Sequence, residues 1–144
     1  MKRFMAVGRV SAGKTTLTRL LEGLPSEDKK TQTAETVGQS IDTPGEYLEH
    51  RGFYRALVVL SVEAEAVLLL QSCTDPRTSF PPGVSAMFAR PVVGVVTKID
   101  LAQTPDQIET ARRHLMEAGA ERIFPLSSVT GEGIEALRSY LSTN

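Results

Sequence analysis

Short apolar runs alternate along the chain with segments in which apolar residues recur at the spacing of an α-helix. Buried strands are predicted at residues 4–7, 66–70, 92–96 and 122–126, with a further short strand at 39–42. Helical spacing marks the segments 14–24, 52–62, 104–118 and 132–141. Continuous apolar strands are typical of parallel sheets that are covered on both faces. The pattern therefore predicts an α/β fold with a mostly parallel sheet of five to six strands and helices on both faces.

The helix expected from residue 105 onward has the clearest end signals. Thr104 stands in the N-cap position, Pro105 in the first helical position, and Gln107 is placed to close a capping box. Gly119 is expected to stop the helix.

The crossover before the strand at 92–96 is poor in helical pattern. Three prolines between residues 75 and 83 predict a loop, and 84–89 is expected to add one or two helical turns. We expect its apolar residues Phe80, Met87 and Phe88 to cover the core rather than to contact partners.

Length and composition restrict the class of protein. At 144 residues, 41% apolar and 23% charged, residues 1–144 are expected to form a single globular domain. A net charge of −1 without a basic stripe argues against a nucleic-acid partner. The single cysteine, Cys73, excludes an intrachain disulfide, fits a reducing compartment and is expected to be buried. No apolar stretch approaches the roughly 20 residues that span a bilayer, so we expect a cytoplasmic protein.

The segment from Gly8 to Thr15 has the spacing of a phosphate-binding loop, Gly-x-x-x-x-Gly-Lys-Thr. It follows a predicted strand and opens a predicted helix, which favours this interpretation over a glycine turn with an incidental lysine. Lys14 is expected to contact the β- and γ-phosphates, and Thr15 to bind Mg²⁺. The predicted nucleotide contacts are Gly8, Ser11, Ala12, Gly13, Lys14, Thr15 and Thr16. The chain is therefore predicted to bind a nucleoside triphosphate.

Asp42-Thr43-Pro44-Gly45 follows another predicted strand. The motif alone is common in turns, but loops after parallel strands converge at one edge of the sheet. Asp42 is therefore expected to join the Mg²⁺ shell through water, and Gly45 to offer its N–H to a γ-phosphate.

Thr97-Lys98-Ile99-Asp100 is interpreted as a base-recognition loop, with a charged strand end before a turn as the alternative. The Asp100 carboxylate can accept two hydrogen bonds from guanine, whereas adenine presents an acceptor at the same place. Such bonds contribute about 1.5–3 kcal/mol each, so GTP is favoured over ATP. The stem of Lys98 can lie over the base.

The segment 127–133 precedes the last predicted helix. Backbone N–H groups at Ser127 and Ser128 are expected to meet the guanine O6 atom, although a simple Ser/Gly entrance to the helix explains the sequence nearly as well.

Taken together, these four segments resemble a Ras-like P-loop small GTPase of the branch related to translation factors. More narrowly, the chain resembles the PduV/EutP family of propanediol and ethanolamine utilisation over nearly its whole length. The runs that carry this resemblance are 1–8, 30–32, 42–49, 54–56 and 97–101. The resemblance implies GTP or GDP and Mg²⁺ as ligands, association with a bacterial microcompartment, and a partner among its shell or lumen proteins.

Several residues depart from the pattern of general GTPases. Thr97 stands where they have Asn, and Ser128 where they have Ala. Glu46 replaces a water-orienting Gln, and Val10 adds bulk where an arginine finger enters, so we expect slow hydrolysis, with no arginine obviously placed to act in cis. The expected catalytic residues are Lys14, Thr31, Gly45 and Glu46, and the expected metal ligands are Thr15, Thr31 and Asp42.

The segment between Gly23 and Asp42 is short. It must hold the first switch, for which Thr31 is the preferred Mg²⁺ threonine and Thr33 and Thr36 are the alternates. The length predicts a shortened or missing second strand, leaving a sheet edge on which a partner or a second copy of the chain can pair.

Three functions remain open from the sequence. The first is a slow GTP-binding switch, and the second is an ATP-dependent kinase of a small carboxylate such as acetate, an activity attributed to some relatives. The sequence shows no dedicated Arg or His arrangement for such an acceptor. The third is a structural subunit that has lost nucleotide binding, against which the intact Lys14 and Thr15 argue. The sequence does not separate the propanediol from the ethanolamine pathway.

Overall fold

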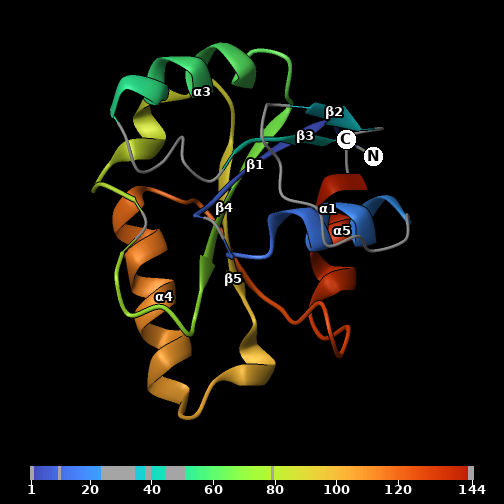
Figure 1. The fold of residues 1–144 in the computed structure, drawn as a ribbon, viewed down its shortest axis with the longest axis vertical. Helices are drawn as coiled ribbons and strands as arrows, with labels where there is room; N and C mark the ends of the chain where they lie inside the picture. Colours follow the sequence, from blue (N-terminus) through green and yellow to red (C-terminus); the bar gives the residue numbers. More distant parts are fainter. Residues whose placement is uncertain are drawn as a thin grey trace.

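The computed structural model describes residues 2–9, 11–23, 35–37, 40–44, 51–78 and 80–142. They form a sheet of six strands with the order β2-β3-β1-β4-β5-β6 (Figure 1). The strands are β1 (Phe4–Val7), β2 (Glu35–Val37), β3 (Ser40–Asp42), β4 (Ala66–Ser72), β5 (Val92–Thr97) and β6 (Ile123–Pro125). The helices are α1 (Lys14–Glu22), α3 (Tyr54–Ser61), α4 (Pro105–Ala118) and α5 (Ile134–Ser142), with short 3₁₀ turns η1 (Arg51–Phe53), η2 (Val84–Met87) and η3 (Ile99–Leu101). The predicted α/β class and strand number are confirmed.

The sheet is parallel except at β2, which pairs antiparallel with β3. All seven residues of β4 are buried, because its Leu and Val side chains meet helices on both faces. In the parallel part, β1 lies between β3 and β4, so the loops after these three strands leave the same edge of the sheet.

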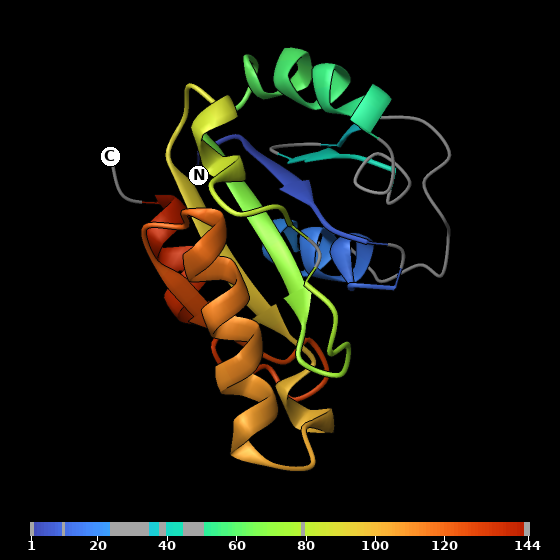
Figure 2. The ribbon, with the colours of Figure 1, turned by 90° about the vertical axis from the view of Figure 1, so that its left-hand side faces the viewer.

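Two helical layers cover the sheet (Figures 1 and 2). Side chains alternate between these layers along a strand. Phe4 and Ala6 pack in the core cluster that contains Leu17 of α1 and Leu137 of α5. Residues of the opposite alternation pack in a second cluster; its members include Met5, Val7, Leu57 of α3 and Leu115 of α4. The sheet therefore carries a core on each face.

The predicted helix ends hold for α4 with one correction. Pro105 stands in the first turn, and Gly119 ends the helix in the left-handed region at φ 103°. The predicted capping box is wrong: Thr104 makes no side-chain capping bond. The Gln107 side chain instead accepts the N–H of Gln103, one residue before the N-cap, so the carboxamide closes a longer loop than the box requires.

The short second strand was predicted from chain length. It is present as β2, three residues long, at an edge of the sheet. Phe80 and Phe88 are buried in the core, as expected, and Cys73 is buried too. Among the residues that the structure describes, no helix is long and apolar enough to cross a membrane.

Candidate nucleotide-binding site

The loop between β1 and α1 has the backbone of a phosphate cradle. Gly8 packs on the neighbouring strand: a Cβ there would lie 3.1 Å from the carbonyl oxygen of Leu70 and 3.1 Å from the Ala12 Cβ. Gly13 caps α1 at φ 93°, and Ser11 also lies at positive φ, 74°. These conformations turn the chain sharply before the helix. The loop can therefore direct several N–H groups toward one anion.

Lys14 supplies the positive charge of this loop. Its side chain is only 9% exposed, and its Nζ donates to the Gly8 carbonyl at 3.1 Å. The ammonium is thereby folded back across the loop instead of extending into solvent. No acidic residue occupies the first turn of α1, so the positive end of the helix dipole is not offset there. The arrangement fits a polyphosphate.

Two hydrogen bonds join the base-recognition segment to the phosphate loop. The Thr97 hydroxyl donates to the Ala12 carbonyl at 2.8 Å in the interior, and Lys98 Nζ donates to the Ser11 carbonyl at 2.6 Å. The partners are more than 80 positions apart in the sequence. Thr97 therefore retains a link to the phosphate loop of the kind that the resemblance assigns to Asn.

Asp100 is held in place by a residue for which only backbone contacts were predicted. The Ser127 hydroxyl donates to Asp100 Oδ1 at 2.7 Å and accepts the N–H groups of Val129 and Thr130, each at 3.1 Å. Asp100 lies exposed on η3 and Ser127 is fully buried, so a fixed group orients an accessible carboxylate. A Ser followed closely by Thr at a turn was the available sequence signal.

Cys73, which directly follows β4, makes two hydrogen bonds to the backbone of the same segment. Its thiol donates to the Lys98 carbonyl at 3.2 Å, and its N–H donates to the Thr97 carbonyl at 3.1 Å. Lys98 adopts a positive φ of 62°, which these contacts help to hold. Burial raises the pKa of the Cys73 thiol, so it stays protonated at neutral pH and acts as a packed hydrogen-bond donor.

The residues expected around Mg²⁺ are only partly described. Thr15 lies in the first turn of α1, and the backbone of Asp42 pairs with Ala6 at the end of β3. The Thr43 hydroxyl donates to the Ala6 carbonyl at 2.9 Å and fixes the start of the Asp-x-x-Gly segment against β1. One hydroxyl and one carboxylate suit Mg²⁺, which takes its other ligands from phosphates and water. Thr31, Thr33, Gly45, Glu46, and the side chains of Thr36 and Asp42 lie outside the described residues.

The link between the two loops makes a testable contribution to stability. Thr97→Val keeps the shape of the side chain but leaves the Ala12 carbonyl buried without its partner. We expect the free energy of unfolding to fall by about 1–3 kcal/mol, measured by urea denaturation. Thr110→Val on α4, outside this site, serves as the matched control. An unchanged stability of the Thr97 variant would show that the hydrogen bond adds nothing.

Known proteins resemble this chain in sequence and in structure. PduV, a propanediol utilization protein of Citrobacter freundii, is 38% identical over 99% of this chain and 94% of its own length. The probable acetate kinase EutP of Escherichia coli K12 is 33% identical over 99% of this chain and 91% of its own. The elongation factor SelB of Methanococcus maripaludis, solved with a GTP analogue, superposes with a TM-score of 0.66 at 21% identity over 97% of this chain. The chain spans 32% of that factor.

The fold and the phosphate loop together define the class as a P-loop GTPase-like domain. The sequence matches the PduV-EutP family, described as ethanolamine utilisation – propanediol utilisation, over residues 1–143. The chain belongs to this family, and the resemblance predicted from its motifs is confirmed.

Proposed function

We propose that this protein is a single-domain, Mg²⁺-dependent GTP-binding protein with slow hydrolysis, acting as a switch or accessory factor in propanediol or ethanolamine utilisation. The observation that carries the proposal is the connection of the two recognition loops through Thr97 and Lys98. A phosphate cradle that is hydrogen-bonded to Thr97 and Lys98, in the same segment as an oriented Asp100, can bind both ends of a guanine nucleotide. Family membership supports the metabolic setting.

Different residues are proposed to bind the phosphates and the base of the nucleotide. The loop N–H groups and Lys14 hold the phosphates, while Asp100, oriented by Ser127, accepts the guanine N–H groups. Bound Mg²⁺ supplies charge neutralisation between the β- and γ-phosphates. Thr31 and Gly45 are proposed to order around the γ-phosphate, and Glu46 is a poor group for orienting water because its charge repels the triphosphate. Hydrolysis is therefore slow.

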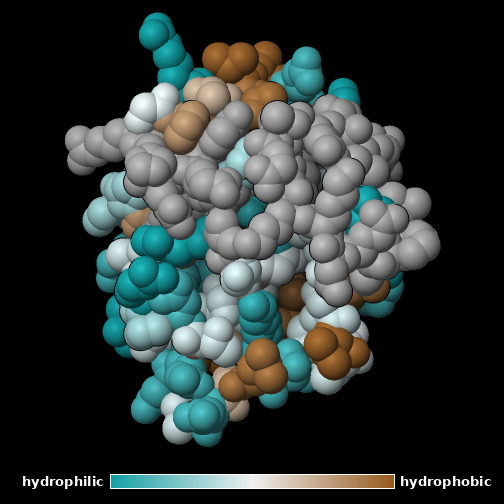
Figure 3. All heavy atoms as spheres, in the orientation of Figure 1, coloured by the Kyte–Doolittle hydropathy of each residue, from teal (hydrophilic) through white to brown (hydrophobic). Residues whose placement is uncertain are grey.

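The proposed switch needs a partner surface. Three apolar side chains around α3 are exposed: Phe53 at 41%, Val59 at 65% and Val62 at 63%. Figure 3 shows an apolar patch over this helix, at the top of the view. We propose that a microcompartment shell or lumen protein binds this exposed apolar patch in the cytoplasm. We also propose that β2, at the edge of the sheet, can pair with another copy of the chain.

A second candidate function is an ATP-dependent acetate kinase; the Escherichia coli relative carries the name probable acetate kinase. A specific observation favours it: two arginines, Arg9 and Arg77, lie beside the phosphate loop, where the sequence had shown no acceptor arrangement. In this reaction an acetate oxygen bonds to the γ-phosphorus. The bond from that phosphorus to the β–γ bridging oxygen breaks, and the products are acetyl phosphate and ADP.

Product analysis separates the two functions. The protein is incubated with Mg²⁺ and either GTP or ATP, with and without acetate. Acetyl phosphate is trapped by hydroxylamine in one set of samples, and released phosphate is measured in a parallel set without hydroxylamine, because the trapping reaction itself releases phosphate. We expect slow phosphate release from GTP, a rate independent of acetate, and no hydroxamate. Acetyl phosphate formed faster than phosphate is released would make the kinase the principal function.

A further inference from the structure

A pocket of about 360 Å³ lies next to the phosphate loop and is separate from the cradle itself. It shares Ser11, Ala12 and Lys98 with the two recognition loops. The rest of its wall is Arg9 of the phosphate loop together with residues from the end of β4 and the segment that follows it. Lys14, Thr15 and Asp100 do not line it. The pocket is therefore contiguous with the proposed nucleotide site and adds to it the side chains of Arg9 and of residues at the end of β4 and beyond.

The lining of the pocket carries an excess of positive charge. Arg9, Arg77 and Lys98 face one carboxylate, Asp75. Arg77 occupies that carboxylate fully: its Nε lies 3.1 Å from Oδ1, its Nη2 3.1 Å from Oδ2, and its backbone N–H donates to Oδ1 at 3.0 Å. These bonds to Arg77 hold the pKa of the Asp75 carboxyl below its usual value. Asp75 is thus ionised and paired, which leaves two cations in excess.

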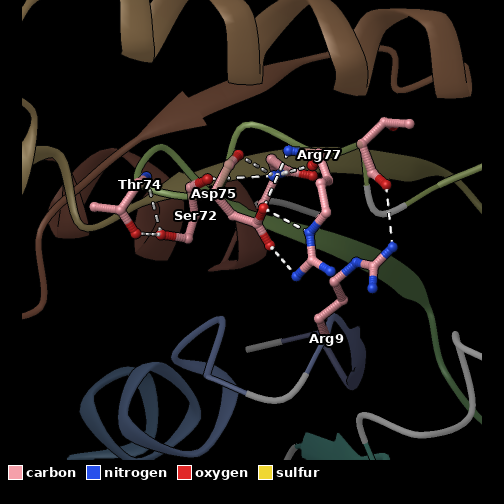
Figure 4. Close-up of polar contacts among 7 residues, drawn as sticks. Arg9, Ser72, Thr74, Asp75 and Arg77 are labelled. Carbon is pink, nitrogen blue, oxygen red and sulfur yellow. Dashed lines mark hydrogen bonds and ion pairs between the residues drawn. The ribbon is translucent and has the colours of Figure 1, made fainter.

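Arg9 is the cation of the pocket whose N–H donors are only partly used by the described residues. It extends from the loop before α1 toward the Asp75–Arg77 pair (Figure 4). Its Nη2 makes one long bond, 3.3 Å, to the Thr78 carbonyl, while its buried Nε has no hydrogen-bond partner among the described residues. It makes no ion pair with any described residue. A buried donor without a partner is costly, and in a native protein it calls for a ligand or ion.

Two hydroxyl groups complete the polar wall. Ser72 Oγ and Thr74 Oγ1 lie 2.7 Å apart, so one of the two hydroxyl groups donates a hydrogen bond to the other (Figure 4). The Thr74 N–H also donates to Ser72 Oγ. One hydroxyl proton of the pair is therefore left over. The wall is fixed from behind by buried Gln71, whose Nε2 donates to the carbonyls of Ser72, Asp75 and Arg77.

We propose that this pocket is a subsite for a small oxyanion, a carboxylate or phosphate, held by the Arg9 guanidinium together with the Ser72–Thr74 hydroxyl pair. A planar guanidinium with free N–H groups matches the oxygens of a carboxylate or phosphate. The link to nucleotide chemistry rests on the proposed function: an anion in this pocket would lie beside the phosphate loop, against Ser11 and Ala12. Binding of the anion itself requires no nucleotide.

The test is an NMR titration of the full chain in the absence of nucleotide, following the arginine Nε–Hε resonances. The probes are sodium acetate and inorganic phosphate, each at constant ionic strength with chloride as the reference anion. We expect a saturable shift of the Arg9 resonance with one or both probes. Tighter acetate binding assigns the subsite to a carboxylate, and tighter phosphate binding assigns it to phosphate.

Variants separate this subsite from general anion attraction. Arg9→Gln is expected to weaken probe binding at least tenfold, read from the remaining backbone resonances of the pocket. The matched control Arg113→Gln, an exposed arginine of α4, is expected to leave it unchanged. Thr74→Val leaves the phosphate loop intact and is expected to weaken probe binding severalfold. This second variant still tests the proposal if Arg9→Gln fails to fold. The absence of a saturable shift, or equal binding by wild type and both pocket variants, overturns the proposal.

GTP titrations of the same samples keep the two proposals apart. A wild-type protein that binds GTP but shows no saturable shift with either anion contradicts the subsite alone. Anion binding by a wild-type protein that does not bind GTP contradicts the proposed function alone.

Discussion

Replacing Lys14 with alanine is expected to reduce GTP affinity by about two to four orders of magnitude. The ammonium is buried and bonded to the Gly8 carbonyl, so it is already positioned over the loop before a ligand arrives. Charge-assisted hydrogen bonds contribute about 1.5–3 kcal/mol each, and two of them to phosphate account for the expected loss. The measurement is retention of labelled GTP in the presence of Mg²⁺.

The control for this variant removes a positive charge elsewhere. Arg113→Ala on the exposed face of α4 changes the net charge equally and is expected to leave GTP binding within about twofold, the range of an exposed substitution. Circular dichroism establishes that the Lys14 variant is folded. Undiminished GTP retention by the folded Lys14 variant would contradict the assignment of the cradle.

Asp100→Asn is expected to exchange guanine for xanthine specificity. The carboxylate is proposed to accept two N–H groups of guanine, and an amide in its place would present an NH₂ group toward one of them. Xanthine carries an oxygen where guanine has its amino group, so the amide can pair with it. We expect GTP affinity to fall by about two to four orders of magnitude, from about 1.5–3 kcal/mol for each lost charged bond, and XTP affinity to rise.

Competition among GTP, XTP and ATP for the wild type and the variant measures this change. Asp106→Asn, an exposed carboxylate in the first turn of α4, is the matched control and is expected to keep the wild-type preference. If Asp100→Asn binds GTP as tightly as the wild type and gains nothing toward XTP, the base does not contact this carboxylate.

Local patterns predicted the fold well because they are set by neighbours in the chain. The apolar runs become β1, β4 and β5, and the glycine spacing from Gly8 to Thr15 becomes a strand–loop–helix unit. The short segment before Asp42 correctly predicted a shortened second strand, because three residues are all that β2 contains.

Contacts between distant segments were beyond the sequence. Nothing in a one-dimensional pattern shows that the Thr97 hydroxyl donates to Ala12, or that the Ser127 hydroxyl donates to Asp100. The pocket that contains Arg9 and Arg77 could not be predicted for the same reason, because these residues lie on separate loops that meet only when β1 and β4 pair. The capping box failed because the Gln107 carboxamide has two backbone N–H groups nearby, those of Gln103 and Thr104, and the folded backbone presents the N–H of Gln103 to it.

These contacts also explain why the departures from the general GTPase pattern are compatible with a working site. Thr97 keeps the connection to the phosphate loop despite its shorter side chain. The departures at Val10 and Glu46 are predicted to affect hydrolysis, whereas the hydrogen bonds that fix the base loop are made by Thr97, Lys98 and Ser127. We therefore expect nucleotide binding to be better preserved than catalysis.

Calorimetric titration of the wild-type protein with GTP and with ATP, in the presence of Mg²⁺, tests most directly whether the connected loops bind a guanine nucleotide. The account predicts a micromolar or tighter complex with GTP and an affinity for ATP at least about a hundredfold weaker, since ATP loses two charged bonds at Asp100. Equal affinities, tighter binding of ATP, or no heat from either nucleotide would contradict it.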